Sequence, residues 1–161
     1  MFDAATLALA MDVLAACRVK GWRIATAESC TGGLIVAALT AVADASDVVE
    51  RGFVAYSNQA KMELLGVPAA MFAASGAVSA EVALAMATGA IGRAGVDLAV
   101  SATGIAGPGG GTREKPVGLV YLGVATKTGT RSERHVFSGS RNDIRRAAAI
   151  RALGMLKEAT G

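Results

Sequence analysis

The stretch that decides the fold is IATAESCTGG, residues 24–33. A short apolar run ends here, and a helix-compatible run over residues 34–39 begins. Ser29 therefore lies at a strand-to-helix turn, where a serine side chain is raised above the edge of a sheet, although the flanking pattern Gly-x-Ser-x-Gly is absent. The first N–H groups of a helix lack partners inside the helix and can hold an oxyanion beside an attacking oxygen. Ser29 is thus a candidate nucleophile, and an equally good interpretation of this stretch alone is that Ser29 or Thr31 caps the helix.

Outward from this turn, helical and strand patterns alternate and then give way to a hairpin. The patterns predict helices over about residues 3–19, 31–42, 58–65, 80–93 and 141–159, and strands over about 23–27, 50–56, 96–102, 117–126 and 131–137. A glycine-rich loop is expected over residues 103–111. Early alternation followed by a hairpin predicts a three-layer α/β/α sandwich with a mixed, mostly parallel sheet of about five strands.

The composition predicts one globular domain over residues 1–161. The chain has 161 residues, of which 53% are hydrophobic and 18% charged, enough for one full core. Aromatic residues make up only 4% and the net charge is +3, so neither base stacking nor a strong electrostatic footprint for nucleic acid is expected. Mild positive charge is compatible with a small anionic ligand.

Cysteine usage and hydropathy bear on the compartment. Cys17 and Cys30 are the only cysteines, and their spacing suggests neither a disulfide framework nor a zinc site. A reducing cytoplasm is the expected location. The apolar N-terminal segment carries Asp3 and Asp12 and is interpreted as an amphipathic helix rather than a signal peptide. No apolar run is long enough and free enough of charge to cross a membrane, so no membrane partner is expected.

A nucleophilic serine needs a general base, and histidine occurs at one position only. His135 lies in the predicted hairpin strand with no motif around it, so a half-exposed strand residue is the favoured interpretation. Lysine can also accept a proton where burial or positive potential lowers its pKa. Lys61 falls in the first turns of a short predicted helix, where the positive end of the helix dipole disfavours an ammonium group. Lys61 is the candidate base, and a solvated surface lysine is the alternative.

The two candidates follow two successive predicted strands. If these strands are parallel neighbours, the turns that carry Ser29 and Lys61 lie side by side at the edge where open α/β sheets bind ligands. Tyr56 belongs to the same edge. Its hydroxyl could orient Lys61 or contact a substrate, although an interface-facing strand tyrosine is equally ordinary.

The glycine-rich loop suits close approach of the backbone to a phosphate or carboxylate. It fits neither the P-loop pattern nor the dinucleotide fingerprint, because Lys115-Pro116 leads into a strand rather than a helix. A nucleoside triphosphate or dinucleotide ligand is therefore disfavoured. The alternative is a long connection without a ligand.

Arginines open the last predicted helix. Arg141 and Arg145 have i, i+4 spacing and so share a helix face, where they could clamp a phosphate. A solvated face paired with Glu133 or Asp143 is as good an interpretation for either one.

Together, these segments resemble the C-terminal domain family of competence/damage-inducible protein CinA, whose stand-alone members include nicotinamide-nucleotide amidases. The resemblance covers nearly the whole chain. It rests on AESCTGG at residues 27–33, YSN at 56–58 with Lys61, GAVS at 76–79, TGIAGP at 103–108, KPVG at 115–118, and on Arg141 and Arg145. Two positions depart from the family pattern: Ala43-Asp44 replaces Pro-Gly, and Gly139-Ser140-Arg141 replaces Gly-Asp-Arg. Both lie outside the serine and lysine segments.

The resemblance implies hydrolysis of the carboxamide of nicotinamide mononucleotide to nicotinate mononucleotide and ammonia, a step in pyridine nucleotide recycling. It assigns Ser29 as the nucleophile and Lys61 as the base of a serine/lysine hydrolase, with Tyr56 beside them. The expected oxyanion site is formed by Cys30, Thr31 and Gly32, and the expected substrate-binding residues are Thr103, Gly104, Gly107, Gly109, Arg141 and Arg145. No metal and no cofactor are needed.

A second hypothesis is a non-catalytic module that binds a nucleotide or a partner and is linked to competence or DNA damage, because a fold can outlive its activity. Retention of both Ser29 and Lys61 favours the enzyme. A homo-oligomer is expected as a partner. The apolar N-terminal helix does not decide this, since it can pack on its own sheet or against another subunit.

Overall fold

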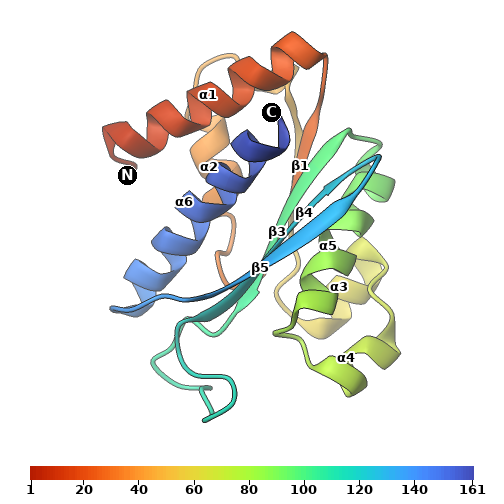
Figure 1. Ribbon diagram of the computed structural model, residues 1–161, viewed down its shortest axis with the longest axis vertical. Helices are drawn as coiled ribbons and strands as arrows, with labels where there is room; N and C mark the ends of the chain where they lie inside the picture. The colour runs from red at the N-terminus through yellow and green to blue at the C-terminus, as the bar shows by residue number, and fades with distance from the viewer.

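The computed structural model describes all 161 residues and shows a five-stranded sheet with helices on both faces (Figure 1). In chain order the elements are α1 (Ala4–Lys20), β1 (Ile24–Glu28), α2 (Leu34–Thr40), the 3₁₀ turn η1 (Ala45–Asp47), β2 (Val49–Val54), α3 (Asn58–Leu65), α4 (Ala69–Ser75), α5 (Ala80–Ala94), β3 (Leu98–Gly104), β4 (Leu119–Thr126), β5 (Thr130–Val136) and α6 (Arg141–Ala159). The predicted α/β/α architecture is confirmed.

The strand order is β2-β1-β3-β4-β5. β1 pairs in parallel with both β2 and β3, whereas β4 runs antiparallel to β3 and β5. Four of the five strands therefore point the same way, and the mixed, mostly parallel sheet is confirmed. β1 is buried at every position, as expected for a strand with neighbours on both sides and helices on both faces.

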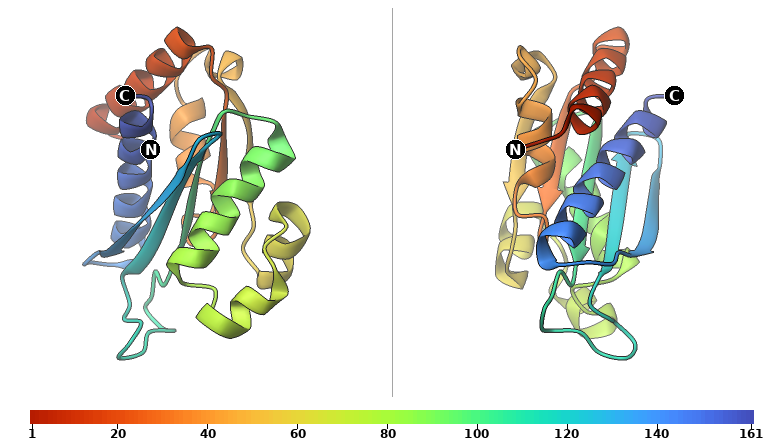
Figure 2. Two further views of the ribbon diagram at one scale, coloured as in Figure 1. Left: turned by 45° about the vertical axis from the view of Figure 1, so that its right-hand side comes forward. Right: turned by 90° about the vertical axis from the view of Figure 1, so that its left-hand side faces the viewer.

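The two helical layers are distinct (Figure 2). α1, α2 and α6 pack together over one face of the sheet, and α5, with α3 and α4 against it, covers the other. The cores under the two layers consist of aliphatic side chains and many alanines, which let helices approach the sheet closely. α1 thus packs against α6 and α2 of its own chain. None of the helices is long and apolar enough to span a bilayer.

Most predicted helix boundaries hold, and capping residues define them. The N-cap side chains of α3, α5 and α6 are Ser57, Ser79 and Ser140, each of which accepts a hydrogen bond from a backbone N–H of the first turn. The residues that follow α1, α3 and α5, namely Gly21, Gly66 and Gly95, are their left-handed C-caps.

Several details differ from the sequence-based expectation: β2 ends at Val54 rather than at Tyr56, and β4 begins at Leu119 rather than near residue 117. α2 begins at Leu34 rather than near Thr31, because Gly32 and Gly33 take left-handed φ angles of 60° and 96° that a helix cannot include. The short helix α4 was not expected. Thr103 and Gly104 belong to β3 rather than to the glycine-rich loop, since they continue the antiparallel pairing with β4.

A charged network ties the edge strand β5 to α6. The Glu133 carboxylate accepts hydrogen bonds from Arg151 at 2.7 and 2.6 Å and from Arg131 at 2.7 Å, and it contacts the ring of His135 at 2.8 Å. Hydrogen bonding to Arg151 is the main reason that the pKa of Glu133 lies well below its usual range. Ionised Glu133 therefore stabilises the packing of the last helix on the edge strand.

We predict that Glu133→Gln lowers the free energy of unfolding by about 1 kcal/mol at neutral pH. Because the folded-state pKa is depressed, this stabilisation is present above the unfolded value of about 4.3 and is lost as the pH falls. Urea denaturation at several pH values should show the difference between wild type and variant shrinking below about pH 4. The control is Glu114→Gln, at an exposed loop position without an ion pair; an equal loss there, or a loss independent of pH, would contradict the prediction.

Candidate active site

Ser29 is held between two strands immediately after β1. Its N–H donates to the carbonyl of Ala102 on β3 at 2.9 Å, and its Oγ lies 3.4 Å from the carbonyl oxygen of Tyr56, which follows β2. The residue is only 8% exposed. Parallel pairing of β1 with β2 therefore places the serine turn beside the segment that leads to Lys61, as expected.

Lys61 reaches Ser29 from the first turn of α3. Its side chain is 2% exposed, its Nζ lies 3.0 Å from Ser29 Oγ, and Nζ also donates to the Tyr56 carbonyl at 3.0 Å. Burial lowers the pKa of Lys61, and the neighbouring Cys30 acts in the opposite direction. Desolvation is thus the main physical reason for this amine to favour its neutral form.

Cys30 lies next to the pair but differs from it chemically. Burial raises the pKa of its thiol to about 11, so the sulfur stays protonated near neutral pH. Of the Ser29 hydroxyl and the Cys30 thiol, only the hydroxyl has a hydrogen bond with the buried amine, and Ser29 remains the candidate nucleophile.

Tyr56 contributes to this arrangement through its backbone. Its carbonyl oxygen, and not its hydroxyl, accepts the hydrogen bond from Lys61. The hydroxyl instead accepts a hydrogen bond from Arg141 Nη2 at 3.2 Å, and the side chain is 61% exposed. Of the two roles considered for the hydroxyl, the orientation of Lys61 is not what the structure shows.

The loop between β1 and α2 carries two free donors. The N–H groups of Cys30 and Thr31 have no hydrogen-bond acceptor, whereas Gly32 donates to the Ser29 carbonyl at 3.1 Å and Gly33 to the Glu28 side chain at 3.0 Å. The expected oxyanion site therefore reduces to the first two of its three predicted members. The Thr31 hydroxyl, buried in the same loop, has no hydrogen-bond partner either.

Glu28 was missed from the sequence. This fully buried carboxylate accepts hydrogen bonds from the N–H groups of Gly33, Ile35 and Val36 and from the Thr26 hydroxyl. It thereby replaces the side-chain cap that α2 lacks, since Gly33 offers none. A glutamate at the last position of an otherwise apolar strand, just before a helix start, was the available signal.

A pocket of about 210 Å³ opens over the Ser29–Lys61 pair. It is lined by Ser29, Cys30, Tyr56, Asn58, Lys61, Ala77, Val78, Thr103, Gly104, Ala106 and Arg141. This set contains two basic residues and no carboxylate. The Thr103 hydroxyl donates to the Ala77 carbonyl at 2.7 Å, so this strand residue and the connector before α5 form one wall.

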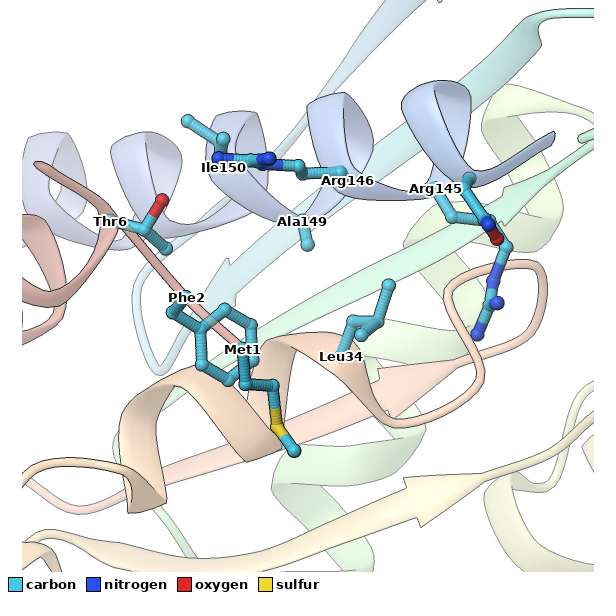
Figure 3. A pocket seen from close by; sticks show the side chains of 9 residues that line it. Met1, Phe2, Thr6, Leu34, Arg145, Arg146, Ala149 and Ile150 are labelled. Carbon is cyan, nitrogen blue, oxygen red and sulfur yellow. The ribbon is translucent and has the colours of Figure 1, made fainter. Parts of the chain in front are cut away.

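Three of the predicted substrate-binding residues, Gly107, Gly109 and Arg145, do not line this pocket. The Gly107 carbonyl accepts a hydrogen bond from Arg141 at 2.7 Å. The Arg145 side chain leaves α6 and points into the curve of the loop between β1 and α2, beside a separate hollow that includes Phe2 and Leu34 (Figure 3).

His135 is far from this chemistry. It lies on β5, paired with Glu133, and its ring stacks on Phe137 with centroids 5.1 Å apart. The expectation of a structural strand histidine fits this placement. No group of three His, Cys, Asp or Glu side chains lies in an arrangement that could hold a metal ion.

The fold and the site define an α/β/α domain with a buried serine–lysine pair at the carboxyl edge of its parallel strands. The family model described as CinA C-terminal domain matches residues 6–160. The chain belongs to this family.

Similar curated sequences bear family names. The chain is 52% identical over 145 residues to a CinA-like protein of Anaeromyxobacter dehalogenans, covering 90% of this chain and 36% of that protein. It is 51% identical over 139 residues to a putative competence-damage inducible protein of Caldicellulosiruptor bescii, covering 86% and 34%. The chain thus spans about a third of the length of these relatives.

Solved structures agree with the fold along nearly the whole chain. The competence/damage inducible protein CihA from Agrobacterium tumefaciens superposes with a TM-score of 0.96 at 44% identity, covering 99% of this chain and 98% of that one. A CinA superfamily protein from Klebsiella pneumoniae gives a TM-score of 0.92 at 36% identity, covering 96% and 97%.

We predict that Glu28→Gln lowers the free energy of unfolding by about 2–3 kcal/mol, because an amide group would turn N–H donors toward backbone N–H groups in a buried site. Denaturant unfolding measures the loss. The control is Glu81→Gln, at an exposed position without an ion pair, which should change stability by less than about 0.5 kcal/mol. A variant at Glu28 as stable as the control would show that the carboxylate does not organise the loop.

Proposed function

We propose that this chain is an amidohydrolase that converts nicotinamide mononucleotide to nicotinate mononucleotide and ammonia. The observation that carries the proposal is the 3.0 Å contact between Ser29 Oγ and the buried Nζ of Lys61. A neutral amine at this distance can take the hydroxyl proton directly. Membership of the CinA family is consistent with an amidase, and the substrate comes from the family resemblance.

In the proposed mechanism, Lys61 removes the proton from Ser29 as Oγ attacks the carboxamide carbon. The tetrahedral oxyanion accepts hydrogen bonds from the free N–H groups of Cys30 and Thr31. Lys61, now an ammonium, protonates the amide nitrogen as the C–N bond breaks, which releases ammonia and leaves an ester on Ser29. Water then attacks this ester with Lys61 as the base, and the carboxylate product leaves.

The Tyr56 carbonyl supports both protonation states of Lys61. It accepts one N–H of the neutral amine and leaves the lone pair free to receive the serine proton. When Nζ becomes an ammonium, the same carbonyl remains an acceptor at 3.0 Å. This fixed partner limits the reorganisation needed when the proton moves.

The pocket agrees with an anionic substrate of which only one part is enclosed. Its volume of about 210 Å³ is below the range of about 300–1,000 Å³ that is common for whole small-molecule sites. A pyridine carboxamide therefore suits the enclosed space, with the ribose phosphate toward the rim. Arg141 lines the pocket and is exposed, and it supplies a positive charge there.

We expect Ser29→Ala and Lys61→Met each to lower kcat for ammonia release from nicotinamide mononucleotide at least about a thousandfold, because each removes half of one proton-transfer unit. Ammonia release in a coupled assay measures this. Lys127→Met is the matched control, since Lys127 lies on the exposed β4–β5 hairpin and pairs with Asp97. Full activity in either dyad variant, or wild type that binds the nucleotide without releasing ammonia, would contradict the proposal.

The pH dependence should follow Lys61. The reaction needs the neutral amine, so kcat/KM is expected to rise as pH increases through the pKa of Lys61 and then to level off. Because burial lowers that pKa, the midpoint should fall below the ordinary lysine value of about 10.4. Rate profiles from about pH 6 to pH 10 test this. A rate that stays flat or falls across the range would rule out Lys61 as the base.

A further inference from the structure

Arg145 contacts the loop between β1 and α2 from outside the pocket that contains Ser29 (Figure 3). Its Nε donates to the Cys30 carbonyl at 3.1 Å, and its Nη2 donates to the Thr31 carbonyl at 3.0 Å. A single planar guanidinium thus holds two successive peptide groups. This fork requires an arginine, because a lysine ammonium cannot present two coplanar donors in this way.

These bonds determine where the N–H groups of the loop point. In a trans peptide unit the C=O and the N–H point in opposite directions. The Cys30 carbonyl points toward Arg145, so the N–H of Thr31, which shares that peptide unit, points away from it. The Ser29 carbonyl is likewise occupied by the Gly32 N–H, and the N–H of Cys30 is directed away from that bond. The directions of the two free N–H groups are therefore fixed by what the carbonyl of the same peptide unit, Ser29 or Cys30, binds.

The loop sequence makes room for the guanidinium. A Cβ at Gly32 would lie 3.1 Å from Arg145 Nη2, closer than side chains ordinarily approach, and the φ of 60° at Gly32 is also strained for other residues. The short distance to Arg145 and the left-handed φ therefore each favour glycine at this position. The guanidinium is permanently charged, and its hydrogen bond to the Cys30 carbonyl polarises the peptide whose N–H belongs to Thr31.

We propose that Arg145 is a positioning residue for the oxyanion site and that it does not bind the substrate phosphate. It orients and polarises the peptide group that bears the Thr31 N–H directly, and it reaches the one that bears the Cys30 N–H through the Gly32 peptide, whose N–H donates to the Ser29 carbonyl. The substrate in this inference rests on the proposed function, whereas the role given to Arg145 does not depend on which substrate reacts with Ser29. Any acyl or phosphonyl transfer to Ser29 develops an oxyanion at the same place. Arg145 acts through the loop, so its effect does not depend on the phosphate of the substrate.

The test compares Arg145→Met and Arg145→Lys with the control Arg146→Met. Arg146 is the next residue of α6, lies beside the same hollow and pairs with Asp3 at the surface. A fluorophosphonate probe that modifies Ser29 is followed by intact mass. The final extent of labelling reports the folded fraction, whereas the rate of labelling reports the oxyanion site. Loss of folded protein lowers the extent and leaves the rate constant unchanged.

We expect the labelling rate constant and kcat for nicotinamide mononucleotide to fall about 10- to 100-fold in Arg145→Met, with KM changed less than about twofold. Arg145→Lys should recover part of the rate, and Arg146→Met should match wild type. With nicotinamide riboside, which lacks the phosphate, the loss should be of the same size. A raised KM for the mononucleotide alone, with an unchanged labelling rate, would overturn the proposal and make Arg145 a phosphate ligand.

The two proposals can fail separately. If wild type releases no ammonia from the mononucleotide but is labelled at Ser29, with a slower rate in Arg145→Met, then the proposed substrate is wrong and the positioning role stands. If the labelling rate constant is the same in wild type and in Arg145→Met, then the positioning role is wrong whatever the substrate. Labelling of wild type no faster than of Lys61→Met would overturn the Ser29–Lys61 dyad, and with it the proposed function.

Discussion

The site depends on the parallel register of β1 with β2. Glu28 pairs with Val54, and the N–H of Ala55 donates to the Glu28 carbonyl at 2.9 Å. Ser29 directly follows Glu28, Tyr56 directly follows Ala55, and the Ser29 Oγ lies 3.4 Å from the Tyr56 carbonyl. A slip of one residue would turn every side chain of β1 to the other face and would separate the serine from the lysine. The hydrogen-bond ladder that builds the sheet therefore also sets the geometry of the candidate dyad.

Burial of Lys61 against these strands is costly for folding and useful for chemistry. Desolvation penalises the ammonium, and the structure supplies no carboxylate partner for Nζ, only the Ser29 hydroxyl and the Tyr56 carbonyl. A structural ion pair would have stabilised the charged form and removed the base. Neutral partners favour the amine, so the absence of a counter-ion agrees with a role in proton transfer rather than in stability.

Much of the fold could be predicted because the residues that begin and end its helices and strands are recognisable in the local sequence. Serine N-caps and glycine C-caps fix the ends of α3 and α5 within a residue of expectation, and short apolar runs mark the strands. The start of α2 could not be predicted this way, since its first N–H groups bind the side chain of Glu28 on the preceding strand rather than a local cap. Asp44 shows the same limit: it takes a left-handed φ of 60° where the family pattern has glycine, and asparagine and aspartate tolerate this conformation better than other residues.

The candidate dyad was accessible to sequence reasoning because two turns at one sheet edge must meet, whereas the roles of the two arginines were not. Arg141 and Arg145 are one turn apart on α6, yet one bridges Gly107 and Tyr56 beside the pocket while the other binds the serine loop from behind. Helical spacing predicts a shared face but says nothing of what lies opposite each turn of that face.

The loop between β1 and α2, which carries Ser29, is held by a negative side chain where its N–H groups point and by a positive one where its carbonyl groups point. On the helix side the Glu28 carboxylate accepts N–H groups, and on the other side the Arg145 guanidinium donates to carbonyls. Because Glu28 already occupies the N–H groups at the start of α2, the positive end of that helix is neutralised and contributes little to an oxyanion. Only the peptide groups of Cys30 and Thr31, ahead of the helix, keep free donors. In the proposed mechanism, stabilisation of the oxyanion is therefore a property of the loop and of the arginine behind it, not of the helix dipole.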